Sequence, residues 1–266
     1  MRKFLFLLIV VLLFFILSGF YYYYKWKPMW QLEMEHPIYV VNHQNDDTLR
    51  VTIIGDSWAE IHSEMMMDTL LSSNLNSLTG HPVKVKSRGK GGEISRGIYS
   101  LMFKNEGFGT KPIISSGVNY CVVIAGINDA ARNLGTLEYC HHIRLILNFL
   151  LSNRIRPVLI EIPEVDIWNI YGKKPVKYII ADYIRSIMTG STMYNCAEYR
   201  DALHSMLVHE NLLDSVVFVP VNGWNGNTHQ INKNYFMDDL IHLNYKGYER
   251  FDSCIDVAIV NDLKNF

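Results

Sequence analysis

A short run of β-branched and apolar residues, 51–54, stops at Gly55-Asp56-Ser57, and the residues that follow have helical spacing. A run of this kind is typical of a buried parallel strand. Ligands of open α/β sheets bind just outside the carboxyl ends of the strands, so we expect Ser57 at a strand-to-helix junction within reach of a ligand. The alternative is a structural turn in which Asp56 or Ser57 caps the next helix.

Strand-like and helix-like segments alternate along the 266-residue chain from Leu49 onward. This alternation predicts an α/β fold, a three-layer sandwich with a parallel, roughly five-stranded sheet flanked by helices and joined by right-handed crossovers. The expected strands are 51–54, 83–86, 120–125, 158–162 and 216–219, and the expected helices are 58–78, 137–151, 194–210 and 245–263.

The amino terminus reads as a membrane segment. Arg2-Lys3 precedes an apolar run, 4–17, that continues through four tyrosines to Tyr24. This order gives a basic cytoplasmic flank, an apolar stretch approaching the roughly 20 residues that span a bilayer, and an aromatic belt. A cleaved signal peptide is the alternative, but Ser18-Gly19 is only a partial match to a cleavage site, so we favour an uncleaved anchor. Either fate places the main domain outside the cytoplasm. The expected organisation is an anchor or signal segment at 1–24, a linker at 25–47 and a catalytic-size domain at 48–266.

Charge and metal-binding patterns exclude several classes of protein. A net charge of −1 gives no basic footprint for nucleic acid. The ten histidines show no spacing typical of a metal site, and we expect neither a metal nor a cofactor. The cysteines form no Cys-x-x-Cys pair, which leaves a zinc ribbon or a thioredoxin motif unsupported, although one disulfide is possible in an exported domain. The four are Cys121, Cys140, Cys196 and Cys254.

Two further polar motifs follow expected strands. Gly89-Lys90-Gly91-Gly92 allows positive φ and close backbone approach to a ligand. A phosphate-binding loop is the rival interpretation, but both common phosphate-loop spacings are absent, so a backbone N–H for an oxyanion fits better. The third strand ends at Gly126-Ile127-Asn128-Asp129, where the Asn128 amide is either an oxyanion donor or part of an Asx turn.

An acid and a histidine lie close together near the carboxyl end, in Asp239-Leu240-Ile241-His242. An acid three residues before a histidine on one tight turn can hold the Nδ1–H of the imidazole. Nε2 is then free to take a proton from a serine.

These four motifs, in this order, resemble the blocks of the SGNH, or GDSL, hydrolases, and the resemblance covers about Leu49 to the carboxyl end. It implies the SGNH-hydrolase version of the flavodoxin-like sandwich, with Ser57 as nucleophile, His242 as general base and Asp239 as its orienting partner. It also implies an oxyanion hole formed by the backbone N–H groups of Ser57 and Gly92 and the side-chain amide of Asn128. The nucleophile elbow of α/β-hydrolases is a competitor, because Gly55-x-Ser57-x-Ala59 approximates it. We reject that fold because acid and base share one turn here.

The segment 164–191 is not explained by these motifs. Long insertions at the carboxyl edge of a sheet are often binding loops or lids, and a surface helix without a functional role is the alternative. Its Trp168 and Tyr171, together with Trp58 after the nucleophile, are expected substrate contacts, and Trp224 is another aromatic residue that could stack on a sugar.

The expected function is therefore a serine esterase that acts through a covalent acyl-enzyme on a small-molecule or polysaccharide ester. A carbohydrate O-acetylesterase at the cell envelope is the leading hypothesis, based on the resemblance, the location and the aromatic residues. The alternatives are an O-acyltransferase acting on an envelope polysaccharide, a lipid esterase or lysophospholipase, and a non-enzymatic binding protein.

Overall fold

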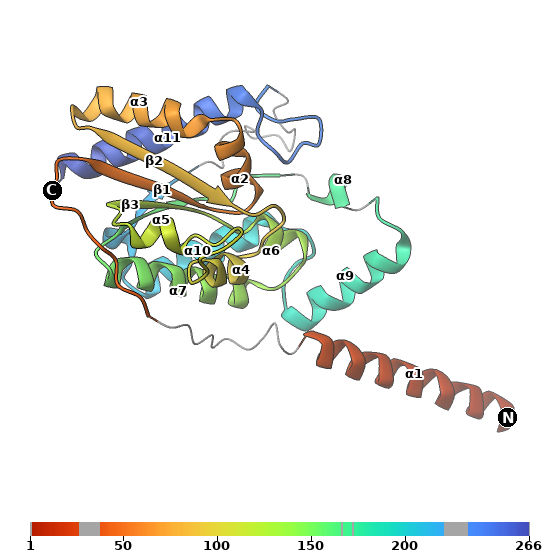
Figure 1. Cartoon of the computed structure of the whole chain (residues 1–266). Coiled ribbons are helices and arrows are strands. Elements are labelled where there is room, and N and C mark those ends of the chain that lie inside the picture. The colour runs from red at the N-terminus through yellow and green to blue at the C-terminus, as the bar shows by residue number, and fades with distance from the viewer. Residues whose placement is uncertain (1, 27–37, 166, 172, 221–233, 266) are drawn as a thin grey trace. The chain divides into compact units, whose positions relative to one another are not determined.

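Five parallel strands form one sheet, as the sequence predicts, and their order is β2-β1-β3-β4-β5 (Figure 1). The strands are β1 Leu49–Gly55, β2 Val83–Gly89, β3 Tyr120–Ile124, β4 Arg156–Ile160 and β5 Val217–Val219. This computed structural model describes residues 2–26, 38–165, 167–171, 173–220 and 234–265. In the register of the sheet, Gly55 pairs with Gly89 of β2 and with Ile124 of β3. The carboxyl ends of these three strands are therefore level, so the loops that follow them meet at one edge.

Helices cover both faces of the sheet (Figure 1). One face carries α2 Ser57–Glu64, α3 Met67–Thr79 and α11 Tyr245–Lys264, and the other carries α4 Ser95–Leu101, α7 Thr136–Ser152 and α10 Cys196–His209. The shorter elements are α5 Lys111–Ser115, α6 Ile127–Ala131, α8 Ile167–Tyr171 and the 3-10 turn η2 Leu213–Ser215. A longer helix, α9, spans Val176–Thr189.

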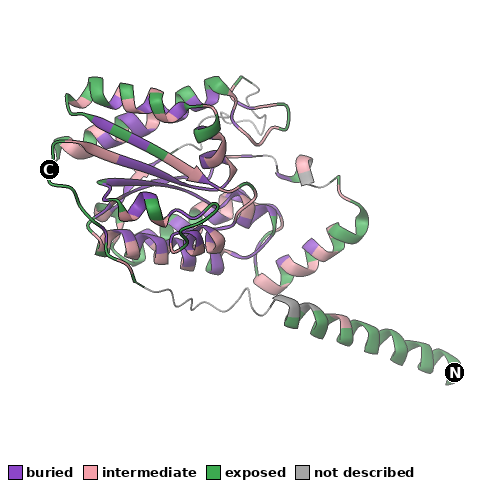
Figure 2. Ribbon diagram, viewed as in Figure 1, coloured by how far each residue is buried: buried purple, intermediate pink, exposed green. Residues whose placement is uncertain are grey.

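The buried core lies between these layers (Figure 2). All five residues of β3 are buried, as are Ile53 and Ile54 of β1 and Val158 of β4. Strands of a parallel sheet are buried on both faces when helices cover them, which explains their continuous β-branched composition. Within the described residues, which include all four cysteines, no disulfide is present.

One expected helix is divided in two. The periodicity predicts a single helix over 58–78, but α2 ends at Glu64 and Met66 takes the left-handed conformation, φ 60°. The break gives α2 and α3 different directions. The first carries Ser57 at its amino end, and the second packs along β2.

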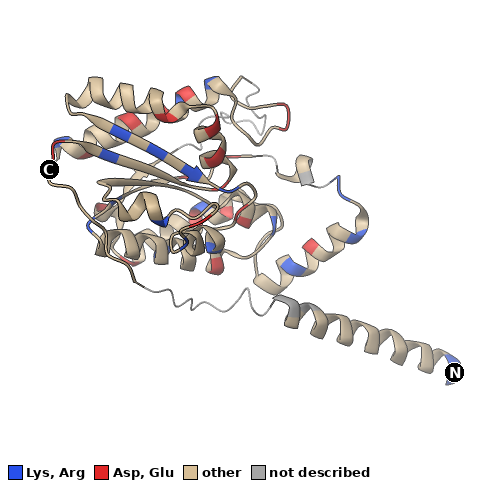
Figure 3. Cartoon of the chain, in the orientation of Figure 1, with Lys and Arg blue, Asp and Glu red and all other residues tan. Residues whose placement is uncertain are grey.

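The edge strand β2 carries lysines on its exposed side (Figure 3). Lys84 and Lys86 alternate with the buried Val83 and Val85. Lysine on an edge strand opposes pairing with another chain, which accounts for this charge without a ligand.

The first of two units contains α1, Arg2–Trp26. Its segment Arg2–Tyr21 is long and apolar enough to cross a membrane, and a signal sequence has the same features. The second unit begins at His36. Of the expected linker, 27–37 lies outside the described residues. Residues after it pack on the α/β unit, where Asn42 donates its amide to Ser115 O at 2.9 Å and the Tyr39 ring contacts Phe149.

Candidate active site

Ser57 is the first residue of α2, directly beyond the end of β1. Glycine is required at the ends of β1 and β2, because the neighbouring backbone lies too close for a side chain. A Cβ on Gly55 would lie 2.4 Å from Ile124 O, and a Cβ on Gly89 would lie 2.2 Å from Asp56 O. Asp56 caps the helix, since its Oδ1 accepts a hydrogen bond from the Trp58 amide at 3.0 Å. The capping turn expected as an alternative is therefore present, and it places the Ser57 hydroxyl at the edge of the sheet.

His242 and Asp239 reach Ser57 from the other end of the chain. His242 Nε2 lies 2.9 Å from Ser57 Oγ, and Nδ1 lies 2.6 Å from Asp239 Oδ2. The turn between acid and base closes through Leu240, which has φ 62°. Burial opposes ionisation of Asp239, but hydrogen bonds from the amide and imidazole of His242 and the amide of Ile241 outweigh it and lower the pKa of this carboxyl. The acid is thus ionised where it holds the imidazole.

Trp58 supports the histidine loop from below. Its ring is fully buried beside Phe236 and Phe251, and its indole N–H donates to Ile241 O at 3.1 Å. The substrate contact expected of Trp58 stays a prediction, because Trp58 is buried and also lines the cavity at Ser57. The first turn of α2 points the side chain after Ser57 into the core, where it packs under the loop.

A small cavity of about 100 Å³ opens at Ser57. It is lined by Asp56, Ser57, Trp58, Gly92, Ile127, Asn128, Ile241 and His242. The expected nucleophile, base and oxyanion donors therefore border one space, although they come from loops after β1, β2, β3 and β5.

Asn128 sits at the start of α6, which follows β3. Its amide Nδ2 donates to Asp56 Oδ2 at 3.2 Å, which fixes the side chain over the end of β1. The preceding Gly126 has φ 120°, and a Cβ there would lie 2.3 Å from Ile162 Cδ1. Gly92 also has a positive φ, 69°, and its carbonyl accepts from Arg132 Nη2 at 2.5 Å.

Solved structures that resemble this chain share its fold. A lipase/acylhydrolase from Enterococcus faecalis aligns over 80% of this chain and 96% of its own, with 14% identity and a TM-score of 0.55. The esterase EstA from Pseudoalteromonas sp. aligns over 82% and 100%, with 13% identity and a TM-score of 0.53. A GDSL-like lipase from Bacteroides thetaiotaomicron VPI-5482 aligns over 79% and 87%, with 16% identity and a TM-score of 0.51. The chain has the SGNH hydrolase fold. No protein-family model and no curated protein matches the sequence.

Two buried acids stabilise the loops of this SGNH fold. Burial raises the pKa of Asp56 to about 7 and that of Asp129 to about 6. Asp129 accepts from the backbone amide of Ser95 at 3.0 Å and from its hydroxyl at 2.6 Å. This contact joins α6, which carries Asn128, to the start of α4 after the glycine loop.

A second histidine lies inside the SGNH fold, beneath the site. His62 of α2 is fully buried, with Nδ1 2.9 Å from Asp68 Oδ1 and Nε2 2.9 Å from Asp252 Oδ1. Burial disfavours its charge, but the two carboxylates outweigh burial and raise the pKa of His62 to about 9. The sequence offers no metal-site spacing for His62, and Asp252 is 190 residues away and could not be assigned to it.

Trp168, another expected substrate contact, does not line the cavity. It lies in α8, is half exposed and packs on Tyr194 with ring centroids 5.7 Å apart. The side chain of Tyr171 and all of Trp224 lie outside what the structure describes. Among the described residues, no group of three or more His, Cys, Asp or Glu side chains is arranged to hold a metal ion.

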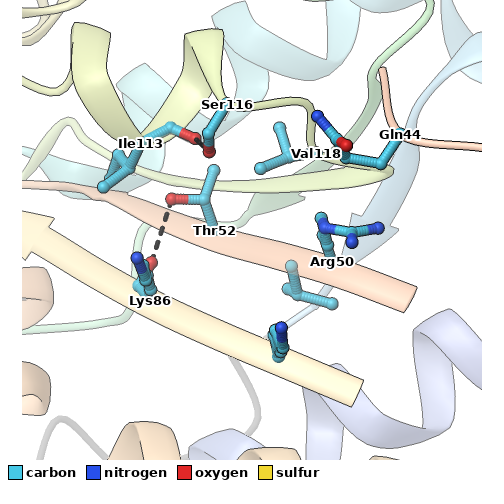
Figure 4. Close-up of a pocket in the computed structure, with 9 residues that line it drawn as sticks. Gln44, Arg50, Thr52, Lys86, Ile113, Ser116 and Val118 are labelled. Carbon is cyan, nitrogen blue, oxygen red and sulfur yellow. Dashed lines mark hydrogen bonds between the residues drawn. The ribbon is translucent and has the colours of Figure 1, made fainter. Parts of the chain in front are cut away.

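A larger cavity, about 290 Å³, lies near the amino ends of β1 and β2 (Figure 4). Arg50, Thr52, Lys86 and Ser116 are among its lining residues, and the Thr52 hydroxyl donates to Lys86 O at 2.9 Å. Ser57 does not border this space. The smaller cavity is the better candidate for chemistry, because it alone of the two combines a nucleophile with a base.

Proposed function

We propose that this chain is a serine ester hydrolase of the SGNH type that acts through a covalent acyl-enzyme. The observation that carries the proposal is the 2.9 Å contact between Ser57 Oγ and His242 Nε2, with Asp239 on the other imidazole nitrogen. A serine hydroxyl is a weak nucleophile unless an adjacent base removes its proton.

In the first step His242 Nε2 accepts the proton of Ser57 while Oγ forms a bond to the acyl carbon. The carbonyl oxygen becomes an oxyanion. His242 then gives the proton to the leaving alkoxide, the C–O ester bond breaks, and an alcohol departs. In the second step water attacks the acyl-enzyme, His242 takes its proton, and Ser57 leaves with that proton as the carboxylic acid is released. Ionised Asp239 stabilises the imidazolium in both steps.

The oxyanion hole consists of the backbone N–H groups of Ser57 and Gly92 and the Asn128 amide, which border the same cavity. A primary amide carries two N–H donors. Asn128 can therefore keep one bond to Asp56 and offer the other to the oxyanion. Donors held in advance stabilise developing charge without reorganising.

The substrate is an acetylated carbohydrate at the cell envelope. The cavity of about 100 Å³ has room for a short acyl group, which is consistent with an acetyl ester. The α1 segment supports an envelope location, because it meets the length and composition of a membrane span. Support for ester chemistry comes from neighbours of the same fold, one of which, EstA, is described in a structure inhibited by monoethylphosphonate.

The test uses the full chain, p-nitrophenyl esters of increasing chain length and a fluorophosphonate probe. Ser57→Ala should reduce hydrolysis by roughly 10³-fold or more and abolish labelling. The matched control is Ser63→Ala, an exposed serine on the same helix, which should change neither. Full activity in Ser57→Ala would refute the proposal.

Product analysis with an O-acetylated glycan separates the finer alternatives. Release of free acetate supports the esterase, whereas acyl transfer to an added glycan acceptor supports an O-acyltransferase. A preference for long acyl chains would instead identify a lipid esterase.

A further inference from the structure

The helix α9 has the reverse of the usual amphipathic arrangement. Four apolar residues spaced 4, 3 and 4 positions apart form one exposed stripe, and Figure 2 shows exposed residues along this helix. They are Val176, Ile180, Tyr183 and Ile187, whose exposed fractions are 70%, 54%, 58% and 63%.

The inward side of α9 is polar. Asp182 is buried, accepts a hydrogen bond from the Tyr194 hydroxyl and pairs with Lys174 at 3.4 Å. Arg185 donates to Arg132 O at 2.5 Å, and the Thr189 hydroxyl donates to Asn133 O at 3.3 Å. These contacts fix the rotation of the helix, because turning the apolar stripe inward would break all of them.

The outward stripe needs an apolar environment. Single exposed apolar residues are normal, but a continuous stripe on one helix marks an interaction site. Aromatic residues and lysines accompany this stripe, which is the composition of helices that lie in a membrane interface. Trp168, Tyr178 and Tyr183 are exposed, and Lys173 and Lys177 are exposed at the start of the helix (Figure 3). Lys177 lies 4.9 Å from the ring centre of Tyr178.

The segment between α1 and the α/β unit limits how far that unit can lie from a membrane that holds α1. Trp26 ends α1, and the described part of the chain resumes at Ile38. At roughly 3.3–3.6 Å per residue, the tether between them can span no more than about 40 Å. If α1 is held in a membrane, the α/β unit is tethered to that membrane by a segment of at most this length.

We propose that the outward stripe of α9 docks on the surface of the lipid bilayer in which α1 is anchored. The apolar and aromatic side chains enter the headgroup region, and Lys173 and Lys177 contact anionic lipids. The inference goes beyond ester hydrolysis and does not depend on which ester the site cleaves.

The experiment places an environment-sensitive dye at position 180 of the full chain, reconstituted in vesicles of phosphatidylcholine with or without phosphatidylglycerol. The variant is Ile180→Cys in a background with Cys140→Ser and Cys254→Ser, the two cysteines that are not buried. The matched control is Val257→Cys of α11, which is 57% exposed and apolar. Hydrolysis of p-nitrophenyl acetate, measured on each variant, reports the catalytic site separately.

With the dye at position 180, we expect its emission to shift to the blue and its fluorescence to be quenched by spin-labelled lipid. With the dye at position 257, we expect neither effect. Lys173→Glu with Lys177→Glu should reduce the quenching in the vesicles that contain phosphatidylglycerol. Equal behaviour of the two positions in active protein would overturn the proposal. A blue shift at 180 without lipid quenching would also overturn it, because a protein surface would then cover the stripe.

Discussion

His62 of α2 and Asp252 of α11 share a hydrogen bond of 2.9 Å in the interior of the protein. The first helix begins with Ser57, and the second begins three residues after His242. The pair therefore joins the two helices whose amino ends carry the serine and the imidazole of the candidate site.

Replacing His62 with Gln should destabilise the fold by about 3–5 kcal/mol, because it leaves Asp252 buried without a cation. The pKa of about 9 lies above the ordinary 6.5, so the stabilisation by His62 is complete below pH 6.5 and is lost as the pH rises through 9. Urea unfolding of the unsubstituted protein and of His62→Gln, at pH 6 and above pH 9, measures this effect. The difference between their free energies of unfolding should be smaller at the higher pH. The control, His81→Gln, breaks an exposed 2.9 Å pair with Asp47 and should cost less than about 1 kcal/mol. Equal losses for the two variants would contradict the prediction.

Asp239→Asn should lower kcat by roughly 10³–10⁴-fold with little change in KM, since the amide no longer stabilises the imidazolium or selects its tautomer. Steady-state kinetics with a p-nitrophenyl ester measures both constants. Asp238→Asn, the exposed neighbouring acid, serves as the control and should remain active. If both variants lose activity equally, Asp239 has no special role.

Asn128→Ala should reduce kcat about 10²–10³-fold while KM changes little, because an oxyanion donor acts mainly in the transition state. The substitution also removes the 3.2 Å hydrogen bond to Asp56. Thermal unfolding is therefore measured beside the kinetics. A variant that raises KM alone would show that Asn128 binds the ground state instead.

Trp58→Phe should keep most of the ring packing while removing the 3.1 Å hydrogen bond to Ile241 O. We expect a stability loss of about 1 kcal/mol and a fall in kcat on the order of ten- to a hundredfold, because the His242 loop is less well positioned. Adding the change to a His242→Ala variant should have no further effect on kcat. An additional loss in that background would mean that Trp58 acts on the substrate directly.

The sheet was predictable because each strand can be recognised from its own residues and those next to it. The run 51–54 is β-branched and ends at a glycine, and β3 is a continuous apolar segment bounded by Gly126. In a parallel sheet such strands end at one edge, so motifs that follow them were expected to meet. The structure brings Ser57, Asn128 and His242 to one cavity accordingly.

Features that depend on distant partners could not be predicted in the same way. Periodicity identifies the inward face of a helix but not what lies against it. The left-handed Met66 between α2 and α3, the burial of Trp58 under a loop 183 residues away and the pairing of His62 with Asp252 all required the fold. The polar inward face of α9 is a further case, because apolar spacing alone predicts burial on the apolar side.

The serine and its base are separated by 185 residues, and they meet only after the first strand and the last helix have both been placed. Under the proposed mechanism, ester cleavage therefore requires that segments from both ends of the α/β unit be folded together. Hydrolysis by the purified protein would then report on the assembled fold and not on any one of its elements.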